Sequence, residues 1–330
     1  MRWGLIGAST IAAEHMIGAI RASGGQIETV LSSSTDRAAS YAATHAIGRG
    51  VTDLDAAMDG VDAVYISTTN EKHFPQAMAA IAAGKHVLCE KPLAMGVADA
   101  VTMVRAAKAA DVTFATNHHL RNAGSHLAIR DAIRAGRIGD VLSIRVFHAV
   151  HLPPHLQGWR IDNPAAGGGV IPDITVHDAD TVRFHLDEDP VDVVAIKTTS
   201  GLGRGVEDSA MSVWSMPSGA MVQSHESFTH PFAGSGIECH GTKGSIFARG
   251  VMTQQPVGEV VLRTEAGEEA LSYALHGLYD RALDLFAKAC AGQGRPSADG
   301  ADGVKSLAVA MAVATAAETG RRVAVDYGGI

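Results

Sequence analysis

The sequence predicts an α/β protein in which a doubly wound parallel sheet is followed by an α+β domain with an open, mostly antiparallel sheet. Apolar strand patterns alternate with helical patterns from residue 3 to about residue 117, which is typical of a parallel sheet with helices on both faces. Strands then dominate, and residues 216–219 and 241–244 have the composition of hairpin turns. We therefore expect a dinucleotide-binding Rossmann domain at 1–117 and a substrate-binding domain at 118–330.

Short apolar runs predict the strands of the first domain. Each run is bounded by turn residues and is too short for a helix, which favours a buried parallel strand. Helices are expected between the strands, and Pro75 is expected to begin one that ends before Gly84. We expect strands at 3–7, 27–31, 61–67, 87–89 and 113–116, and helices that end near residue 22 or span about 36–45, 53–58, 75–83 and 97–110.

The second domain is expected to begin with a helix and to continue mainly as strands. The helix at about 125–135 ends at Gly136, and residues 141–150 alternate apolar and polar side chains, as a strand does. Two helices and one strand are expected to close the chain. We expect strands near 191–200, 208–216, 220–229, 236–240, 245–248 and 259–263, helices near 278–291 and 304–319, and a last strand at 323–326.

The composition excludes several classes of partner. The net charge is −8 and there is no basic run, so we expect no nucleic acid and no anionic membrane surface as partner. No uncharged apolar run reaches membrane-spanning length. The three cysteines have no CxxC spacing, which fits a reducing compartment. Because the first strand begins at Trp3, with no signal peptide before it, we expect a cytoplasmic protein.

The turn after the first strand resembles a dinucleotide fingerprint with two departures. Gly7 supplies the tight turn, Ser9 takes the place of the usual second glycine, and Ala12 takes the place of the third. Ser9 adds a hydroxyl for a phosphate, and Ala12 is small enough for helix–strand packing. A diphosphate would lie over the helix N-terminus, near Thr10 and Ile11. Ordinary strand–helix turns can also show this pattern.

The end of the second strand indicates which dinucleotide would bind. Enzymes that prefer NAD usually carry an acid there, about 20 residues past the fingerprint, to hold the ribose hydroxyls. This chain has Ser32 and Ser33 instead, with Arg37 nearby. Hydroxyls and a guanidinium would bind a 2′-phosphate, so the pattern favours NADP(H). In the alternative interpretation, Arg37 is a solvated helix residue and Asp36 serves a ribose.

A lysine at the carboxyl end of a strand is the main catalytic candidate. Glu90 and Lys91 directly follow the strand at 87–89, and Pro92 restricts Lys91 to an extended conformation. Ligands of open α/β sheets lie outside the carboxyl ends of the strands. The polar segment after the strand at 61–67 reaches the same edge of the sheet, and its candidates for cofactor binding are Thr68, Thr69, Asn70 and His73.

A second candidate group follows the glycine run at 167–169. Asp173 and His177 are four residues apart, so on a helix they share one face. Such an aspartate can orient the imidazole and favour its protonated form, which suits a proton donor near neutral pH. Asp180 could compete for the histidine. In the alternative interpretation Asp173 is a helix cap and His177 is structural.

These motifs resemble those of the glucose-fructose oxidoreductase, inositol dehydrogenase and rhizopine-catabolism family. The resemblance rests on residues 84–92, and on Asp173 and His177 after the glycine run. It implies a Rossmann domain followed by an open antiparallel sheet, and a cis peptide bond at Pro92. Four further segments, 7–12, 67–71, 117–122 and 151–160, resemble a sugar reductase of this family that uses NADPH.

The resemblance implies roles for the candidate residues. Lys91 and His177 would be catalytic, with His177 giving a proton to the substrate oxygen and Lys91 stabilising its charge. Asp173 would hold His177. The substrate would be a small sugar, and the protein a monomer or a homodimer. From position alone, we add Asn117, His151, His155 and Trp159 as candidates for the sugar, and Asn117, Trp159 and Arg160 as candidates for the cofactor.

Other functions remain as alternatives. The histidines near residue 150 suggest a metal site, but Pro153 and Pro154 interrupt any helix there and no HExxH motif is present, so we expect no metal. A serine hydrolase is disfavoured because the chain has no Gly-x-Ser-x-Gly motif. A non-catalytic dinucleotide sensor on the same fold, or an inositol or aldose dehydrogenase, remains an alternative.

Overall fold

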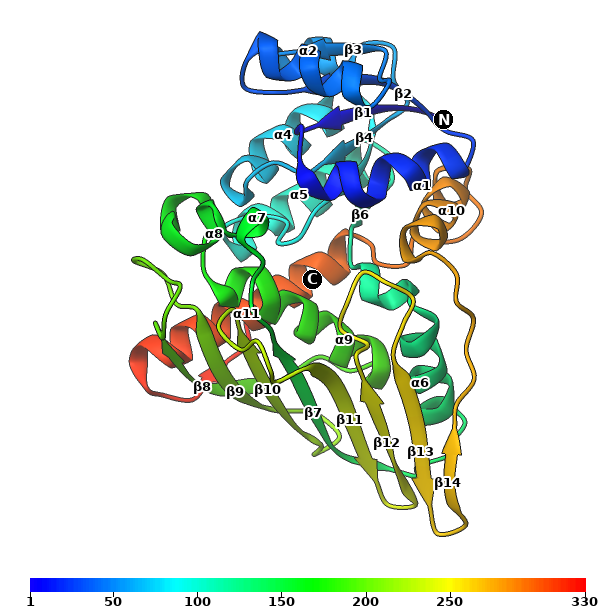
Figure 1. Cartoon of the computed structure of the whole chain (residues 1–330), viewed down its shortest axis with the longest axis vertical. Helices are drawn as coiled ribbons and strands as arrows, with labels where there is room; N and C mark the ends of the chain where they lie inside the picture. The colour runs from blue at the N-terminus through cyan, green and yellow to red at the C-terminus, as the bar shows by residue number, and fades with distance from the viewer. The chain divides into compact units, whose positions relative to one another are not determined.

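A computed structural model describes residues 1–330, which form two compact units (Figure 1). Unit 1 comprises residues 1–119 and 279–304, and unit 2 comprises residues 120–278 and 305–330. The expected boundary at 117/118 differs from this division because a late segment returns to unit 1. Its helix α10 (Leu278–Cys290) brings the Phe286 ring to within 5.4 Å of the Trp3 ring, measured between centroids. Both rings are fully buried.

Unit 1 contains a six-stranded, entirely parallel sheet with the strand order β3-β2-β1-β4-β5-β6. The order reverses between β1 and β4, and in open sheets ligands bind in the crevice at such a point. The parallel sheet confirms the predicted fold class of this part of the chain. The strands are β1 (Arg2–Ile6), β2 (Gln26–Leu31), β3 (Arg49–Val51), β4 (Ala63–Ile66), β5 (His86–Cys89) and β6 (Phe114–Thr116).

The helices of unit 1 follow the expected order, with one correction. Helix α4 (Asn70–Ala82) begins five residues before Pro75, after Thr69 in an extended conformation. A proline inside a helix removes one backbone hydrogen bond, and the rest of α4 forms around it. Gly84 follows the helix with φ +70°, as predicted. The remaining helical segments are a π-helical turn (Ala12–Met16), α1 (Ile17–Ala22), α2 (Thr35–Thr44), α3 (Leu54–Met58) and α5 (Val97–Ala109).

Unit 2 contains a nine-stranded sheet with the order β14-β13-β12-β11-β7-β10-β9-β8-β15. All neighbours are antiparallel except β7 and β10, which are parallel. Strand β14 was not predicted, because its four residues are all exposed and carry no apolar pattern. The strands are β7 (Val141–Ala149), β8 (Asp192–Thr198), β9 (Ser209–Ser215), β10 (Met221–Ser227), β11 (Ser235–Gly241), β12 (Gly244–Arg249), β13 (Glu259–Thr264), β14 (Gly267–Ala270) and β15 (Val323–Ala324).

Helices cover one face of this sheet, as Figure 1 shows. The long ones are α6 (Gly124–Arg134), α9 (Val176–Leu186) and, from residue 305 on, α11 (Gly300–Thr319). None of the helices combines the length and the apolar character that a membrane crossing requires. The short segments are a 3-10 turn (His119–Asn122), α7 (Pro154–Gln157), α8 (Trp159–Asp162), a second 3-10 turn (Pro164–Ala166) and a π-helical turn (Ile171–Thr175).

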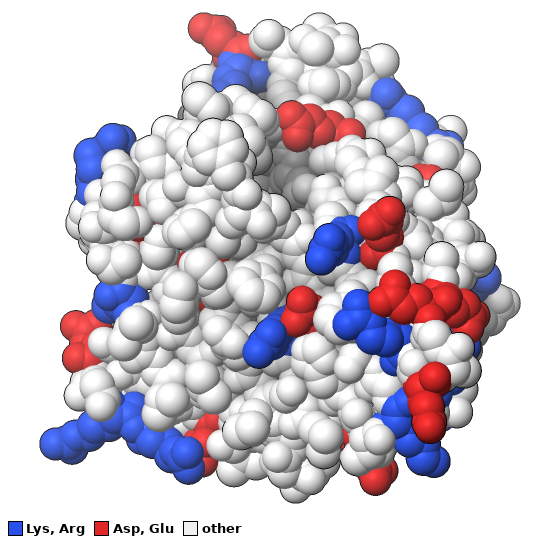
Figure 2. All heavy atoms as spheres, turned by 60° about the horizontal axis from the view of Figure 1, so that its bottom comes forward, with Lys and Arg blue, Asp and Glu red and all other residues white.

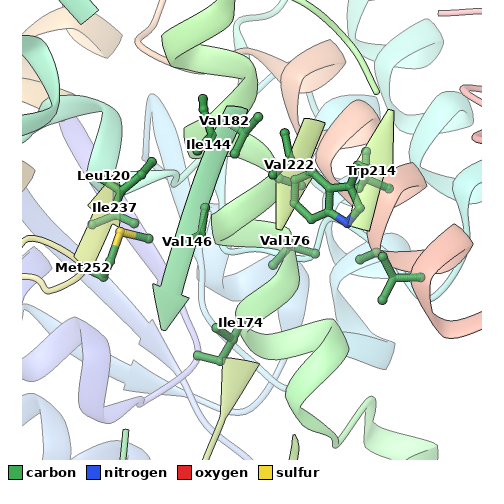
Figure 3. Close-up of a cluster of buried hydrophobic side chains, with 14 of the residues drawn as sticks. Leu120, Ile144, Val146, Ile174, Val176, Val182, Trp214, Val222, Ile237 and Met252 are labelled. Atoms are coloured by element: carbon green, nitrogen blue, oxygen red, sulfur yellow. The ribbon is translucent and has the colours of Figure 1, made fainter. Parts of the chain in front are cut away.

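The core of unit 2 lies between the sheet and these helices. Figure 3 shows Val146, Trp214 and Val222 of the sheet beside Val176 and Val182 of α9, all fully buried. Such burial is the main favourable contribution to folding. The opposite sheet face is open, as antiparallel sheets allow, and it exposes apolar side chains. These include Val194, Ile196, Met211, Val213 and Met221.

Charged side chains are mixed in sign on the face of the molecule that Figure 2 shows. Lysine and arginine atoms lie among aspartate and glutamate atoms and do not gather into one basic patch. Opposite charges also pair across neighbouring strands of unit 2, where Arg145 lies 3.5 Å from Glu238 and Arg263 lies 2.6 Å from Glu268. Exposed pairs of this kind contribute little to stability.

Candidate active site

The turn after β1 packs closely against the segment after β4, and only glycine fits at residue 7. Gly7 has φ +118°, and an added Cβ would lie 3.0 Å from the backbone carbonyl carbon of Ser67. The Ser9 hydroxyl accepts a hydrogen bond from the Ala12 amide at 3.2 Å and lies 2.7 Å from the Ser67 hydroxyl. Ala12 is fully buried. The turn therefore presents a serine hydroxyl and the first amides of a helix, including those near Thr10 and Ile11.

Helix α2 fastens this turn through two side chains. Arg37 donates from Nη2 to the Ala8 carbonyl at 2.9 Å, and the Tyr41 hydroxyl donates to the Ser9 carbonyl at 2.8 Å. Ser32 is buried at the end of β2, whereas Ser33 is exposed. Burial raises the pKa of Tyr41 to about 12, so the phenol keeps the proton that it donates. Tyr41 was not predicted, because a lone tyrosine on a helix carries no sequence signal.

The His73 ring bridges the segments that follow β4 and β5 through hydrogen bonds. Its ring is 1% exposed, with Nδ1 2.7 Å from the Pro92 carbonyl and Nε2 3.2 Å from the Thr68 carbonyl. Burial lowers the pKa of His73. Among the other candidates of this segment, Thr69 precedes α4 as its N-cap residue and Asn70 is buried in its first turn. In this structure, His73 thus supports the turn that carries Lys91.

Glu90 is held by two donors at the carboxyl end of β5. The Tyr65 hydroxyl donates to Glu90 Oε1 at 2.5 Å, and Asn117 Nδ2 donates to the same oxygen at 2.6 Å. Burial raises the pKa of Glu90, and the hydrogen bonds from Tyr65 and Asn117 oppose that shift. The peptide bond between Lys91 and Pro92 is cis, as the resemblance implied. Tyr65 was not predicted, because it lies inside an apolar run.

Unit 1 also contains a stack of three rings, those of His15, Tyr279 and His119. The His15 ring lies 4.9 Å from the Tyr279 ring with 6° between their planes, and the His119 ring lies 5.8 Å from it with 10° between planes. Burial raises the pKa of Tyr279, and the charge of Glu90 adds to this effect. The sequence did not indicate this cluster, since its residues come from three distant segments.

In unit 2, the glycine run lets a loop pass close to its neighbours. An added Cβ on Gly168 would lie 2.5 Å from the Trp159 carbonyl, and one on Gly169, which has φ +118°, would lie 2.4 Å from Glu207 Oε1. The Gly169 amide donates to the Arg160 carbonyl at 2.8 Å. The glycines therefore allow the short helix α8 to pack closely against the start of the segment that carries Asp173 and His177.

Asp173 and His177 are both buried, at 8% and 7% exposure. Asp173 lies in the π-helical turn and His177 at the start of α9, and Asp173 Oδ2 lies 3.5 Å from Arg160 Nε. Asp180, the possible competitor for His177, is bound by Arg121, which donates to its two carboxylate oxygens at 2.8 and 2.7 Å. The Asp180 carboxylate is thus engaged by a cation.

The remaining candidates lie on the segment before the glycine run. His151 is exposed and pairs through its backbone with Thr229, and His155 is exposed on α7. The Arg160 guanidinium lies 4.8 Å from the centroid of the Trp159 ring. No group of three or more His, Cys, Asp or Glu side chains in the structure is arranged to hold a metal ion.

Comparison with known proteins places both halves of the chain in one family. The NAD-binding Rossmann fold of the GFO/IDH/MocA oxidoreductase family matches residues 1–118, and the C-terminal domain of that family matches residues 126–247. The chain is 56% identical over 330 residues to 1,5-anhydro-D-fructose reductase of Ensifer adhaerens, covering 99% of each chain. It is 30% identical over 277 residues to myo-inositol 2-dehydrogenase of Thermotoga maritima, covering 81% of this chain and 80% of the relative.

Solved structures agree with this result. The aldose-aldose oxidoreductase of Caulobacter crescentus, complexed with glycerol, matches with a TM-score of 0.90 and 25% identity over 98% of this chain and 99% of that chain. A levoglucosan dehydrogenase in complex with NADH and L-sorbose matches with a TM-score of 0.90 over 100% of both chains; at 22% identity, this shows the fold alone. The chain belongs to the GFO/IDH/MocA family of oxidoreductases.

Proposed function

We propose that the protein reduces the 2-keto group of 1,5-anhydro-D-fructose to give 1,5-anhydro-D-mannitol, with NADPH as cofactor. The observation that carries this proposal is the 56% identity over 99% of both chains to the reductase of Ensifer adhaerens. This identity supports the reduction of a sugar ketone by an oxidoreductase of the family, and we extend it to 1,5-anhydro-D-fructose as the substrate and NADPH as the cofactor.

The residues of unit 1 fit a dinucleotide. Gly7 gives the tight turn that such a site needs, since an added Cβ would meet the Ser67 backbone, and the Ser9 hydroxyl beside it could bind a phosphate. Ser32 stands where an acid would hold a ribose hydroxyl, and the exposed Arg37 can bind a 2′-phosphate by charge. The alternative ribose ligand, Asp36, is exposed in the first turn of α2. This donor set favours NADP(H).

The preference for NADPH can be tested at one residue. In Arg37→Gln, the guanidinium is lost, and we expect KM for NADPH to rise by about tenfold or more while KM for NADH changes little. Arg49→Gln is the matched control, since Arg49 is an exposed arginine whose pairing with Asp59 does not involve the turn. An equal change for both cofactors would mean that Arg37 acts only by fastening the turn at Ala8.

Residues of the chain would act on the substrate in two ways, by stabilising negative charge and by donating a proton. When bound, the nicotinamide supplies a hydride to the keto carbon. His177 would donate a proton to the substrate oxygen, and Lys91 would orient the sugar and stabilise the negative charge that develops on that oxygen. Asp173 would help to orient His177, and Trp159, Asn117, His151 and His155 remain candidates for contacts with the sugar.

The direct test is oxidation of NADPH in the presence of 1,5-anhydro-D-fructose. The same assay is run with NADH, and with a panel of inositols and aldoses and NADP in the oxidative direction. We expect fast turnover with the ketone and NADPH alone. Turnover of an inositol or an aldose instead would support a dehydrogenase function, a candidate favoured by the 30% identical myo-inositol 2-dehydrogenase. Tight binding of NADP without turnover of any sugar would support a sensor.

A further inference from the structure

A group of polar side chains lies within the apolar core of unit 2. His148 of β7 is 8% exposed, while Asp178 of α9 and Ser224 and Glu226 of β10 are fully buried. The parallel pairing of β7 with β10 places Glu226 directly beside His148. Figure 3 shows the chain neighbours Val146, Val176 and Val222 in the apolar cluster. A charge in such surroundings is costly unless it is paired.

The hydrogen bonds of this group require one more proton than ionised carboxylates supply. The Ser224 hydroxyl lies 2.7 Å from Glu226 Oε1 and 3.2 Å from Asp178 Oδ2. A hydroxyl has one hydrogen, so it can donate to one of the two oxygens only. If both acids were ionised, the other contact would bring two oxygens together without a hydrogen. A proton on one carboxyl group removes this conflict.

The surroundings decide which carboxyl group holds the proton. Asp178 Oδ1 accepts a hydrogen bond from His148 Nδ1 at 2.8 Å, so Asp178 has donors on both oxygens. Glu226 has no lysine or arginine among the causes of its pKa shift, and the hydrogen bonds from Ser224 and Thr175 only oppose that shift. Burial and the charge of Asp178 raise the pKa of Glu226 well above its usual value. Glu226 then donates to Ser224, and Ser224 donates to Asp178.

This group adjoins His177, the proton donor of the proposed reaction. His177 precedes Asp178 on α9, and the centroid of its ring lies 6.2 Å from that of His148. With Glu226 neutral, Asp178 is the negative charge that binds the His148 imidazole, whose ring centroid lies 6.2 Å from that of His177. The other titratable and charged groups that act on the cluster or on His177 are His126 of α6, whose pKa burial lowers to about 4, His225 of β10, Asp180 of α9, which Arg121 binds, and Asp173, which lies 3.5 Å from Arg160.

We propose that Glu226 is a neutral, protonated acid at physiological pH, and that Asp178, the one remaining negative charge of this cluster, is a positioning residue that holds His148 and by its own charge favours the protonated form of His177. Asp178 and His148 do not touch the substrate in this scheme. The consequence for catalysis rests on the proposed function, because it depends on His177 as the proton donor. The protonation of Glu226 itself does not.

The protonated acid can be observed by infrared spectroscopy. A buried carboxylic acid absorbs at a C=O stretching frequency that an ionised carboxylate lacks. At neutral pH, we expect the difference spectrum between the wild type and Glu226→Gln to contain this band, with a shift in D₂O. Glutamine is close in size to the neutral acid, so the variant is expected to fold. A difference spectrum with carboxylate bands only would overturn the proposal.

The charge of Asp178 can be tested by NMR titration of the imidazoles. In Asp178→Asn, loss of the negative charge disfavours the imidazolium, so we expect the titration midpoint of His177 to fall by about one pH unit. Glu226→Gln is the matched control and should leave that midpoint in place, because it replaces one neutral group by another. An unchanged midpoint in Asp178→Asn would overturn the coupling, as would an equal fall in Glu226→Gln.

These measurements need no substrate. If the protein reduced none of the sugars tested, the proposed function would fail, while the infrared band and the His177 midpoint would still report on Glu226 and Asp178. If turnover with 1,5-anhydro-D-fructose is found, the alkaline limb of its kcat profile should move to lower pH in Asp178→Asn, following the imidazole midpoint. A kcat limb that stays in place would overturn the link to catalysis.

Discussion

In unit 1 the Glu90 carboxylate accepts two hydrogen bonds on one oxygen, whereas in unit 2 Glu226 and Asp178 lie against the single hydroxyl of Ser224. Burial raises the pKa of both glutamates. Hydrogen bonds oppose the shift in both, from Tyr65 and Asn117 to Glu90 and from Ser224 and Thr175 to Glu226, but the charge of Lys91 opposes it for Glu90 whereas the charge of Asp178 increases it for Glu226. In both sites burial is the largest cause of the shift, and the comparison shows that neighbouring donors and charges either oppose it or add to it.

The two clusters also differ in what they could contribute to a reaction. In unit 1 the glutamate precedes Lys91, so an acid held as a carboxylate would lie beside the cation that we propose for oxyanion stabilisation. In unit 2 a neutral acid would leave Asp178 free to act on the imidazoles of His148 and His177. One cluster would thus support a fixed charge and the other a transferable proton, the two requirements of ketone reduction by hydride and proton.

Removal of the cation in unit 1 should have the largest effect. In Lys91→Ala, we expect turnover of 1,5-anhydro-D-fructose to fall by about a hundredfold or more, because charge stabilisation on the substrate oxygen is lost in the transition state. His177→Ala should give a loss of similar size by removing the proton donor. The measurement is kcat, with NADPH binding followed separately by fluorescence.

Lys108→Ala serves as the control, since Lys108 is an exposed lysine of α5. It should keep the wild-type kcat. A folded Lys91→Ala variant with unchanged kcat would remove Lys91 from the proposed mechanism, and a loss confined to NADPH binding would assign it to the cofactor.

Some features of unit 1 could be predicted from the sequence, and others could not. The position of Lys91 after β5, the Gly84 turn and the alternation of strands and helices follow from local patterns, and the structure agrees with them. The return of α10 to unit 1 depends on contact between the Trp3 and Phe286 rings, which no local pattern encodes.

The residues that could not be predicted from the sequence have partners on distant segments of the chain. Tyr65 lies within an apolar strand, and Ser224 and Glu226 meet His148 only because β7 and β10 pair in parallel. From the sequence, an antiparallel arrangement was expected for most of this sheet, and it gave no reason to bring these segments together. Polar groups whose partners come from distant strands need the topology before their chemistry can be inferred.

The stability of the second cluster should depend on pH in a predictable direction. Glu226 keeps its proton in the folded state, whereas in the unfolded chain it releases the proton near its usual value of 4.5. Above that pH the unfolded state binds fewer protons, so the wild type loses stability as the pH rises, until Glu226 ionises in the folded state too. Glutamine does not titrate, so Glu226→Gln escapes this loss.

We therefore expect the free energy of unfolding of Glu226→Gln to rise relative to the wild type by about 1.4 kcal/mol per pH unit above 4.5. Urea unfolding of both proteins over a series of pH values measures this difference. A difference independent of pH would mean that Glu226 is ionised in the folded protein, and would make the two clusters alike.

The smallest effect is expected from removing one of the donors to Glu90. In Asn117→Leu the carboxylate keeps the Tyr65 hydroxyl but loses the amide at 2.6 Å, and a hydrogen bond to a charged group contributes about 2 kcal/mol. We expect the free energy of unfolding to fall by that amount at neutral pH. Because the lost bond favours the ionised form, the pKa of Glu90 should rise further, and the deficit should shrink as acidification protonates the carboxyl group in both proteins. Tyr65→Phe, which removes the other donor, should behave in the same way under urea unfolding. A deficit of equal size at acidic and neutral pH would show that Glu90 is already protonated, and that the donors of unit 1 hold a neutral acid as Ser224 does in unit 2.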